Sequence, residues 1–169
     1  MNKILKDINI DYLFLNLTGC KRCLDTNSGL ENAISKVLNL LGDNRVKINV
    51  NNIHINTEDK AREFGLEISP TIRINGRDIQ SDWIDNKCSD CGDLCNCAQF
   101  ITCRLWKWNG KEYTAAPENL IVDAILENIY SQKSSTADVK HSLRGLNSNM
   151  KTFFAETRKG ANLNNSSCC

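Results

Sequence analysis

A Cys-x-x-Cys pair, Cys20 and Cys23, stands at the junction of two different hydrophobic patterns. The residues before it, Tyr12 to Leu17 (YLFLNL), form a short apolar run that predicts a buried strand. The residues after it carry apolar side chains at spacings of three and four, which predicts one face of an amphipathic helix. These residues are Leu30, Ala33, Ile34, Val37, Leu38 and Leu41. The pair therefore lies where a strand passes into a helix.

The nine cysteines of the 169-residue chain fall into three groups. The first is the Cys-x-x-Cys pair, the second is a crowded segment, and the third ends the sequence. Grouped thiols are typical of disulfide chemistry or of soft-metal capture. Because nine is an odd number, at least one cysteine stays outside any set of internal pairs. The second group comprises Cys88, Cys91, Cys95, Cys97 and Cys103, and the third comprises Cys168 and Cys169.

Length and composition bound the class of protein. A chain of 169 residues suits one domain with an extension and can bury a core without disulfides. The net charge of +1 argues against nucleic acid as the main partner. The segment Met1 to Asp11 lacks the features of a signal peptide, and no stretch reaches the roughly 20 apolar residues of a membrane helix. We therefore expect a soluble cytoplasmic protein with no membrane contact and mostly reduced thiols.

Two hairpins and a strand are predicted from local patterns. The turn pairs Asn75-Gly76 and Asn109-Gly110 predict hairpins within residues 71–79 and 104–114. Alternating apolar and polar residues predict a strand over residues 45–55. This succession of strands between helical segments favours an α/β protein.

Helix signals complete the outline. Thr57 is expected to cap a short charged helix, and Pro117 to open a longer one. Apolar residues at spacings of three and four predict a last helix from Val139 to Phe153, and the polar stretch Lys159 to Ser167 predicts a mobile tail. The expected organisation is a domain over residues 1–132, with a cysteine-rich insert at 86–103, followed by a helix and tail over 133–169.

Two segments resemble the thioredoxin-like fold, an α/β fold whose central mixed sheet is flanked by helices. They are Thr18 to Cys23 after the buried strand, and Ser69-Pro70-Thr71 before the first hairpin. The resemblance covers roughly residues 10–130. It implies that Pro70 follows a cis peptide bond and lies against the two cysteines.

The chain more closely resembles a bacterial and archaeal family of thioredoxin-like proteins of unknown function. The segments that carry this likeness are Cys20 to Thr26, Ser69 to Ile79 and Cys88 to Cys95. The likeness is specific for the fold, and it implies little about activity because the family has no settled function.

The first cysteine pair suits disulfide exchange. At a helix N-terminus, Cys20 is placed where a thiolate is stabilised, and the positive charges of Lys21 and Arg22 favour the same anion. Cys23, one turn later, is placed to resolve a mixed disulfide. We expect the pair in an exposed loop; the alternative is a buried, inert pair. Phe14 stands where thioredoxins keep a buried acid, which puts general disulfide reductase activity in question.

The crowded second group, from Cys88 to Cys103, leaves three interpretations open. Four thiolates in a short loop can surround zinc or hold an iron–sulfur cluster, and acidic neighbours in the loop suit a cation. The same cysteines could instead form two disulfides, or remain reduced thiols. The single-residue gap between Cys95 and Cys97 is irregular for a zinc site.

The terminal pair, Cys168 and Cys169, offers a mobile dithiol. Adjacent thiolates bind soft ions such as Hg(II) and As(III) well. The tail resembles the vicinal cysteine ends of mercuric reductases, which pass metal to a buried pair. The alternative is an accessory tail without function.

Three hypotheses follow. The first is a thiol–disulfide oxidoreductase in which Cys20 attacks, Cys23 resolves and Pro70 shapes the substrate groove, with the other cysteines as a relay or structural site. Its partner is a protein or small-molecule thiol or disulfide, and the chemistry of the pair needs no cofactor. The second is a soft metal or metalloid chaperone that uses the same pair together with Cys168 and Cys169. The third is a structural domain with zinc in the insert.

Overall fold

The computed structural model describes residues 6–42, 45–87, 102–131 and 145–161. Along this part of the chain, helices and strands alternate up to α2 (Glu58–Glu63), five strands then follow one another, and the strands form two sheets. The α/β class expected from the sequence is confirmed. None of the helices within the described ranges is long and apolar enough to cross a membrane.

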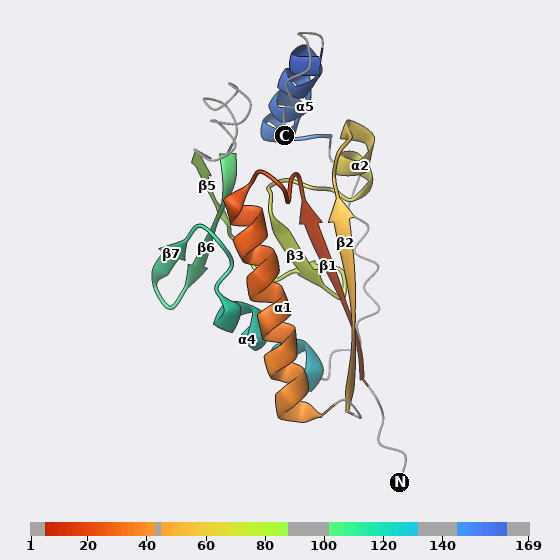
Figure 1. The fold of residues 1–169 in the computed structure, drawn as a ribbon, viewed down its shortest axis with the longest axis vertical. Coiled ribbons are helices and arrows are strands. Elements are labelled where there is room, and N and C mark those ends of the chain that lie inside the picture. Colours follow the sequence, from red (N-terminus) through yellow and green to blue (C-terminus); the bar gives the residue numbers. More distant parts are fainter. Residues whose placement is uncertain (1–5, 43–44, 88–101, 132–144, 162–169) are drawn as a thin grey trace.

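The larger sheet is mixed and has four strands in the order β2-β1-β3-β4 (Figure 1). The central strand β1 pairs in parallel with β2 on one side and antiparallel with β3 on the other. The short strand β4 continues the sheet as a hairpin with β3. The bounds are Lys6–Phe14 for β1, Val46–His54 for β2, Thr71–Ile74 for β3 and Arg77–Asp78 for β4.

The second sheet is antiparallel, with the order β5-β6-β7. Its strands are Ile84–Lys87 (β5), Thr102–Trp108 (β6) and Lys111–Tyr113 (β7). It lies beside the first helix, to the left in Figure 1. Strand β5 was not expected from the sequence pattern. Both ends of the segment 86–103 are strand residues, paired as Lys87 with Thr102 and Asn86 with Cys103.

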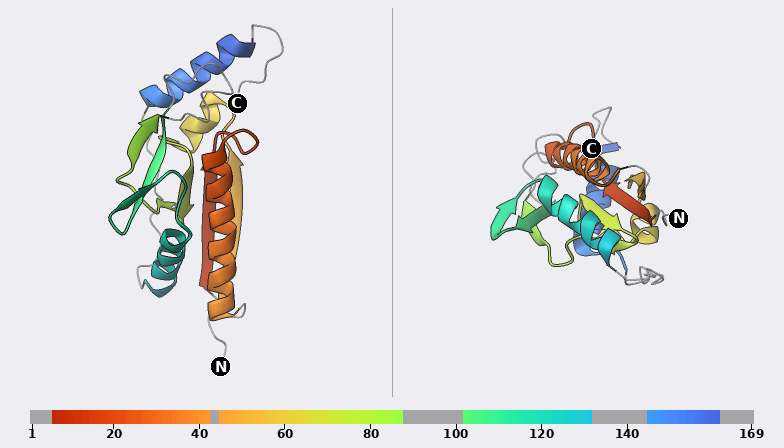
Figure 2. Two further views of the ribbon diagram at one scale, coloured as in Figure 1. Left: turned by 60° about the vertical axis from the view of Figure 1, so that its left-hand side comes forward. Right: turned by 90° about the horizontal axis from the view of Figure 1, so that it is seen from below.

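Helices α1 (Lys21–Leu41) and α4 (Glu118–Tyr130) cover one face of the larger sheet, and helices α2 and α5 (Ser148–Ala161) cover the other face only at the end where β1 and β2 finish (Figure 2). Helices α1 and α4 contact each other; α4 also contacts β1, and α1 contacts β2. Helices α2 and α5 contact each other at the end of the molecule where β1 and β2 finish (Figure 1). The pairing encloses two separate apolar clusters, one on each face.

The alternation of side chains along β1 assigns residues to the two clusters. Ile8, Ile10, Tyr12 and Phe14 belong to the main core, which α1 and α4 cover. Leu13 and Leu15 face the other way and belong to the second core under α2 and α5. The other members of the second core are Ile55, Ala61, Leu66, Leu146, Met150, Phe153 and Phe154.

The turn and cap predictions are confirmed at several places. Asn75-Gly76 and Asn109-Gly110 have positive φ angles and join β3 to β4 and β6 to β7. The side chain of Thr57 accepts a hydrogen bond from the backbone N–H of Lys60 and caps α2. Gly42, with φ +76°, ends α1 and donates its N–H to Leu38.

The last helix begins later than its sequence pattern predicted. It runs from Ser148 to Ala161 instead of starting at Val139, and Gly145 to Asn147 precede it without helical structure. Asn147 explains the start, because its side-chain oxygen accepts a hydrogen bond from the N–H of Met150 at 2.9 Å. The helix also extends into the predicted mobile tail, whose first residues are helical.

Candidate functional site

The loop between β1 and α1 is organised by the side chain of Asn16. Its Oδ1 atom accepts hydrogen bonds from the backbone N–H groups of Thr18 and Gly19 at 2.7 and 2.9 Å. Cys20 then takes the N-cap position of α1, and its carbonyl oxygen receives the first helical hydrogen bond, from Leu24. The sequence therefore places Cys20 at the N-terminus of a 21-residue helix, as expected.

Both cysteines of the pair are buried. The exposed fraction is 1% for Cys20 and 2% for Cys23. The expectation of an exposed loop setting is therefore wrong. The physical reason is tertiary: the pair belongs to the main core, together with residues of β6 such as Cys103 and Trp106.

The two thiols of the pair interact, and this interaction changes the pKa of Cys23. A side-chain hydrogen bond with Cys20 raises the pKa of Cys23, and burial and the nearby charge of Cys20 raise it further. The Ser69 hydroxyl and a backbone hydrogen bond at Asn16 act in the opposite direction, because they stabilise the Cys23 thiolate. The net effect is that Cys23 keeps its proton well above the ordinary range.

Tyr12 lies beneath the first turn of α1. Its hydroxyl donates a hydrogen bond to the carbonyl oxygen of Cys23 at 2.6 Å. Burial raises the pKa of Tyr12, and the charges of Cys23 and Cys20 raise it further, so the hydroxyl stays protonated. The sequence analysis did not single out Tyr12. The signal available was a tyrosine within an apolar strand, since a buried tyrosine hydroxyl usually needs a hydrogen-bond partner.

The segment before β3 lies against the cysteine pair. The peptide bond between Ser69 and Pro70 is cis. The Oγ atom of Ser69 lies 3.7 Å from the Sγ atom of Cys23 and accepts a hydrogen bond from the N–H of Leu15 at 3.2 Å. Ser69 therefore touches the site directly, although the sequence analysis used it only as part of a motif.

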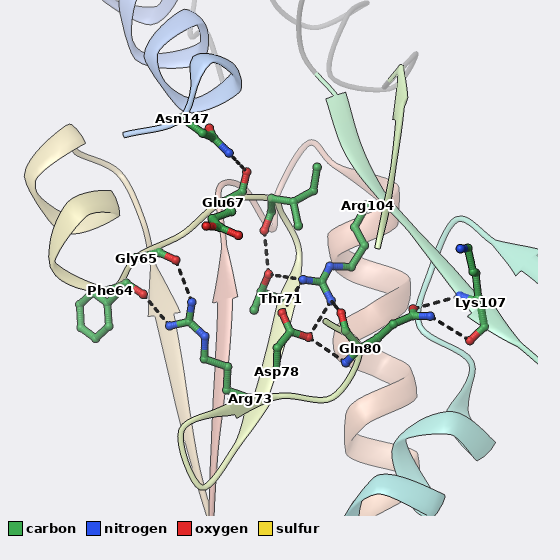
Figure 3. A network of polar contacts seen from close by, with 11 residues as sticks. Phe64, Gly65, Glu67, Thr71, Arg73, Asp78, Gln80, Arg104, Lys107 and Asn147 are labelled. Atoms are coloured by element: carbon green, nitrogen blue, oxygen red, sulfur yellow. Dashed lines mark hydrogen bonds and ion pairs between the residues drawn. The ribbon is translucent and has the colours of Figure 1, made fainter. Parts of the chain in front are cut away.

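A buried arginine fixes this segment from the side of β6 (Figure 3). The backbone N–H of Arg104 donates to the carbonyl oxygen of Ser69 at 3.0 Å, and its guanidinium donates to the Thr71 hydroxyl at 3.1 Å. The same guanidinium forms two hydrogen bonds with the carboxylate of Asp78, at 2.8 and 2.5 Å, and lies over the ring of Trp106. Sequence reasoning missed Arg104, because an arginine in a hairpin is normally exposed.

The two residues between the cysteines point in different directions. Lys21 is exposed and forms an ion pair with Asp25. Arg22 is only 7% exposed, and its Nη2 atom donates to the side-chain oxygen of Asn86 at 3.1 Å and to the carbonyl oxygen of Lys87 at 3.4 Å. Its Nη1 atom is buried and has no hydrogen-bond partner among the described residues. Arg22 thus ties the start of α1 to the end of β5.

The remaining cysteines divide between described and undescribed parts of the chain. Cys103, predicted as a ligand in the insert, lies on β6 and is 3% exposed. Among the described residues, no three His, Cys, Asp or Glu side chains are arranged to hold a metal ion. The other cysteines of the predicted metal site and the terminal dithiol lie outside the described residues: Cys88, Cys91, Cys95, Cys97, Cys168 and Cys169.

A comparison with protein families places this site within a known group. Residues 8–125 match the family described as "Domain of unknown function (DUF2703)". The chain belongs to this family. The matched range includes the Cys-x-x-Cys pair, Pro70 and Cys103, and it ends before α5 and the terminal cysteines. The chain matches no curated protein and no solved structure.

Proposed function

We propose that this DUF2703 protein is a thiol–disulfide oxidoreductase with a thioredoxin-like fold. Cys20 is the attacking thiol and Cys23 the resolving thiol. The observation that carries the proposal is the contact between two thiols at the N-terminus of a long helix, with Ser69 and Pro70 beside them. A helix N-terminus stabilises a thiolate, and a second thiol within reach can close a disulfide.

The order of elements supports the thioredoxin-like fold. Strand β1, helix α1 and strand β2 form a unit with parallel strands, β3 and α4 contribute to the main core, and β4 forms a hairpin with β3. Pro70 precedes β3, and the residue before it touches Cys23. In this proposal Pro70 and its neighbours form one wall of the place where a substrate disulfide binds.

In the first chemical step Cys20 attacks while Cys23 stays protonated. The Cys20 thiolate attacks one sulfur of a substrate disulfide, a mixed disulfide forms, and the other substrate sulfur leaves as a thiolate. Cys23 supports this step because its raised pKa keeps it protonated, and its S–H can donate a hydrogen bond to the Cys20 sulfur. Tyr12, held to the carbonyl of Cys23, keeps the first turn of α1 in place.

The second step releases the substrate. Cys23 loses its proton and attacks the Sγ atom of Cys20, the mixed disulfide breaks, and a Cys20–Cys23 disulfide forms. The Ser69 hydroxyl supports this step, because its interaction with Cys23 lowers the pKa of that thiol. The substrate leaves as a dithiol, and an external thiol reductant restores the pair. Because both cysteines are buried, a substrate must displace some of the residues that shield them from solvent before it reaches Cys20.

Catalysed reduction of a disulfide by an excess of thiol reductant tests the proposal. Replacing Cys20 by Ser should abolish turnover, and replacing Cys23 by Ser should slow it strongly, because the resolving thiol is lost. Ser35→Ala, on the exposed side of the same helix, is the matched control and should keep full activity. Undiminished turnover in folded Cys20→Ser protein would exclude Cys20 as the nucleophile.

Capture of a soft metal or metalloid is the second candidate, favoured by the direct contact between the same two thiols. A dithiol of this kind suits As(III) or Hg(II). It predicts stoichiometric binding that protects Cys20 and Cys23 from alkylation, together with negligible disulfide turnover. Turnover without such protection would favour the oxidoreductase.

A zinc or iron–sulfur site in the insert and a relay through Cys168 and Cys169 remain predictions. Both concern residues outside the described part of the chain. Native and denaturing intact mass of protein purified without air tests the first, because a bound metal adds mass only under native conditions. Removing Cys168 and Cys169 tests the second through the rate at which the oxidised pair is reduced.

A further inference from the structure

We propose that Cys103 is a third redox-active thiol, which exchanges with the Cys20–Cys23 pair inside the protein. This inference rests on the proposed disulfide chemistry and adds a residue to it. Cys103 is separated from the pair by about 80 residues of sequence, but three observations bring it to the same place.

The first observation is shared burial. Cys103 is 3% exposed and belongs to the main core, which also contains Cys20 and Cys23. In both Figure 1 and the left view of Figure 2, the start of β6 and the start of α1 lie at the same end of the molecule. Cys103 is the second residue of β6, and Cys20 caps α1.

The second observation is a connection through β5. Asn86 is the residue opposite Cys103 in the β5–β6 pair. The side chain of Asn86 accepts a hydrogen bond from Arg22, which stands between Cys20 and Cys23 in the sequence. The strand partner of Cys103 is thus bound directly to the turn of helix that carries both cysteines.

The third observation is a connection through β6 itself. Arg104, which follows Cys103, donates its backbone N–H to the carbonyl oxygen of Ser69 at 3.0 Å. The hydroxyl of Ser69 lies 3.7 Å from the Sγ atom of Cys23. The neighbours of Cys103 on both strands are therefore hydrogen-bonded to residues at the cysteine pair. On β5 the link is from Asn86 to Arg22, and on β6 it is from Arg104 to Ser69.

Burial of all three thiols favours exchange among them over direct exchange with large external disulfides. A buried internal thiol can reach the pair without displacing the residues that shield Cys20 and Cys23 from solvent. A neighbouring group within the same protein also acts at a high effective concentration.

The proposed step is an isomerisation without net oxidation. The Cys103 thiolate attacks the Sγ atom of Cys20 in the Cys20–Cys23 disulfide. The bond between Cys20 and Cys23 breaks, a bond between Cys103 and Cys20 forms, and Cys23 leaves as a thiolate that takes up the proton given by Cys103. The products are one disulfide and one thiol, as before the step.

Disulfide mapping in the full-length Cys23→Ser protein tests this proposal. Oxidised glutathione first forms a mixed disulfide on Cys20 and releases one reduced glutathione. Cys103 then attacks the Cys20 sulfur and releases the second. After alkylation and digestion, a Cys20–Cys103 peptide should be the main form of Cys20. In the matched Cys23→Ser/Cys103→Ser control, Cys20 should remain bound to glutathione.

The proposal is overturned if the folded Cys23→Ser protein keeps glutathione on Cys20 while Cys103 is recovered as a thiol or linked to another cysteine. Circular dichroism establishes that this variant is folded. If it is not, the wild-type protein at partial oxidation must yield the Cys20–Cys103 peptide beside the Cys20–Cys23 one, and its absence overturns the proposal.

Turnover of an external disulfide, measured on the wild-type protein, separates this inference from the proposed function. A Cys20–Cys103 link without turnover supports internal exchange and refutes the oxidoreductase. Turnover through Cys20 without any Cys103 link supports the oxidoreductase and refutes the role of Cys103.

Discussion

The hydroxyl oxygen of Ser69 lies 3.7 Å from the sulfur of Cys23 and accepts a hydrogen bond from the backbone N–H of Leu15. Because its oxygen already accepts from Leu15, the Ser69 O–H hydrogen can point to the sulfur. This direction agrees with the lowering effect of Ser69 on the pKa of Cys23. One hydroxyl therefore joins the end of β1, the segment before Pro70 and the resolving thiol.

Replacing Ser69 by Ala should slow the resolving step. The pKa of Cys23 should rise further, because the group that stabilises its thiolate is lost and the effects of Cys20 and burial remain. The rate of Cys23 alkylation, followed against pH by peptide mapping, measures this shift. Ser81→Ala, at an exposed serine, is the control. An unchanged pH profile in the Ser69 variant would show that the hydroxyl does not act on the thiol.

Stability should fall as the pH rises into the alkaline range. Cys23 and Tyr12 both have raised pKa values in the folded protein, so the folded state holds protons that the unfolded state has lost. Their contribution is complete below the unfolded pKa values, about 8.5 for cysteine and about 10 for tyrosine, and it is lost as the pH rises through the folded values. Urea unfolding between about pH 7 and 11 measures the decline.

Tyr12→Phe isolates the tyrosine part of this dependence. At neutral pH it should cost about 1 kcal/mol, because one buried hydrogen bond to the Cys23 carbonyl is lost. Above about pH 10 the variant should lose less stability per pH unit than the wild type, because Phe has no proton to release. Parallel curves for the two proteins would contradict this account of Tyr12.

The ion pair between Arg104 and Asp78 should show strong coupling. Asp78→Ala leaves the buried guanidinium without its carboxylate and should destabilise the protein by about 3 kcal/mol. Arg104→Met removes the buried charge, and in that background Asp78→Ala should cost much less. Urea unfolding of the four proteins in this double-mutant cycle gives the coupling. Additive losses would mean that the two side chains stabilise the protein independently.

Arg22 should hold β5 against α1. Arg22→Met keeps an apolar side chain but removes the hydrogen bonds to Asn86 and Lys87. Amide hydrogen exchange over residues 84–87 should then become faster, while the protection of α4 stays the same. Lys21→Met is the control, because Lys21 is exposed. Equal protection of β5 in both variants would show that this contact does not fix the strand.

Local patterns were sufficient to predict most elements of the main sheet. The apolar run at Tyr12 to Leu17 overlaps only the last three residues of β1, which runs from Lys6 to Phe14, whereas the two Asn-Gly turns lie where they were predicted, since their signals are local. Strand β5 was missed for the opposite reason. Its residues (IDNK) include one apolar side chain, and the strand exists through its pairing with β6.

The candidate site was predictable in its cysteines but not in its surroundings. The spacing of Cys20 and Cys23 and the position of Pro70 can be read from the sequence. The burial of the pair and the approach of β6 depend on contacts between distant segments. The roles of Arg22 and Arg104 were hidden for a further reason: charged residues are usually exposed, and burial occurs only where tertiary partners satisfy them.

Redox titration of the wild-type protein with glutathione, followed by alkylation, intact mass and peptide mapping, tests the central claim most directly. The account predicts that the first oxidised species to form has lost two hydrogens and contains a disulfide that links Cys20 to Cys23 or to Cys103. A folded protein in which Cys20 and Cys23 both remain thiols in excess oxidised glutathione, while other cysteines oxidise, would contradict it.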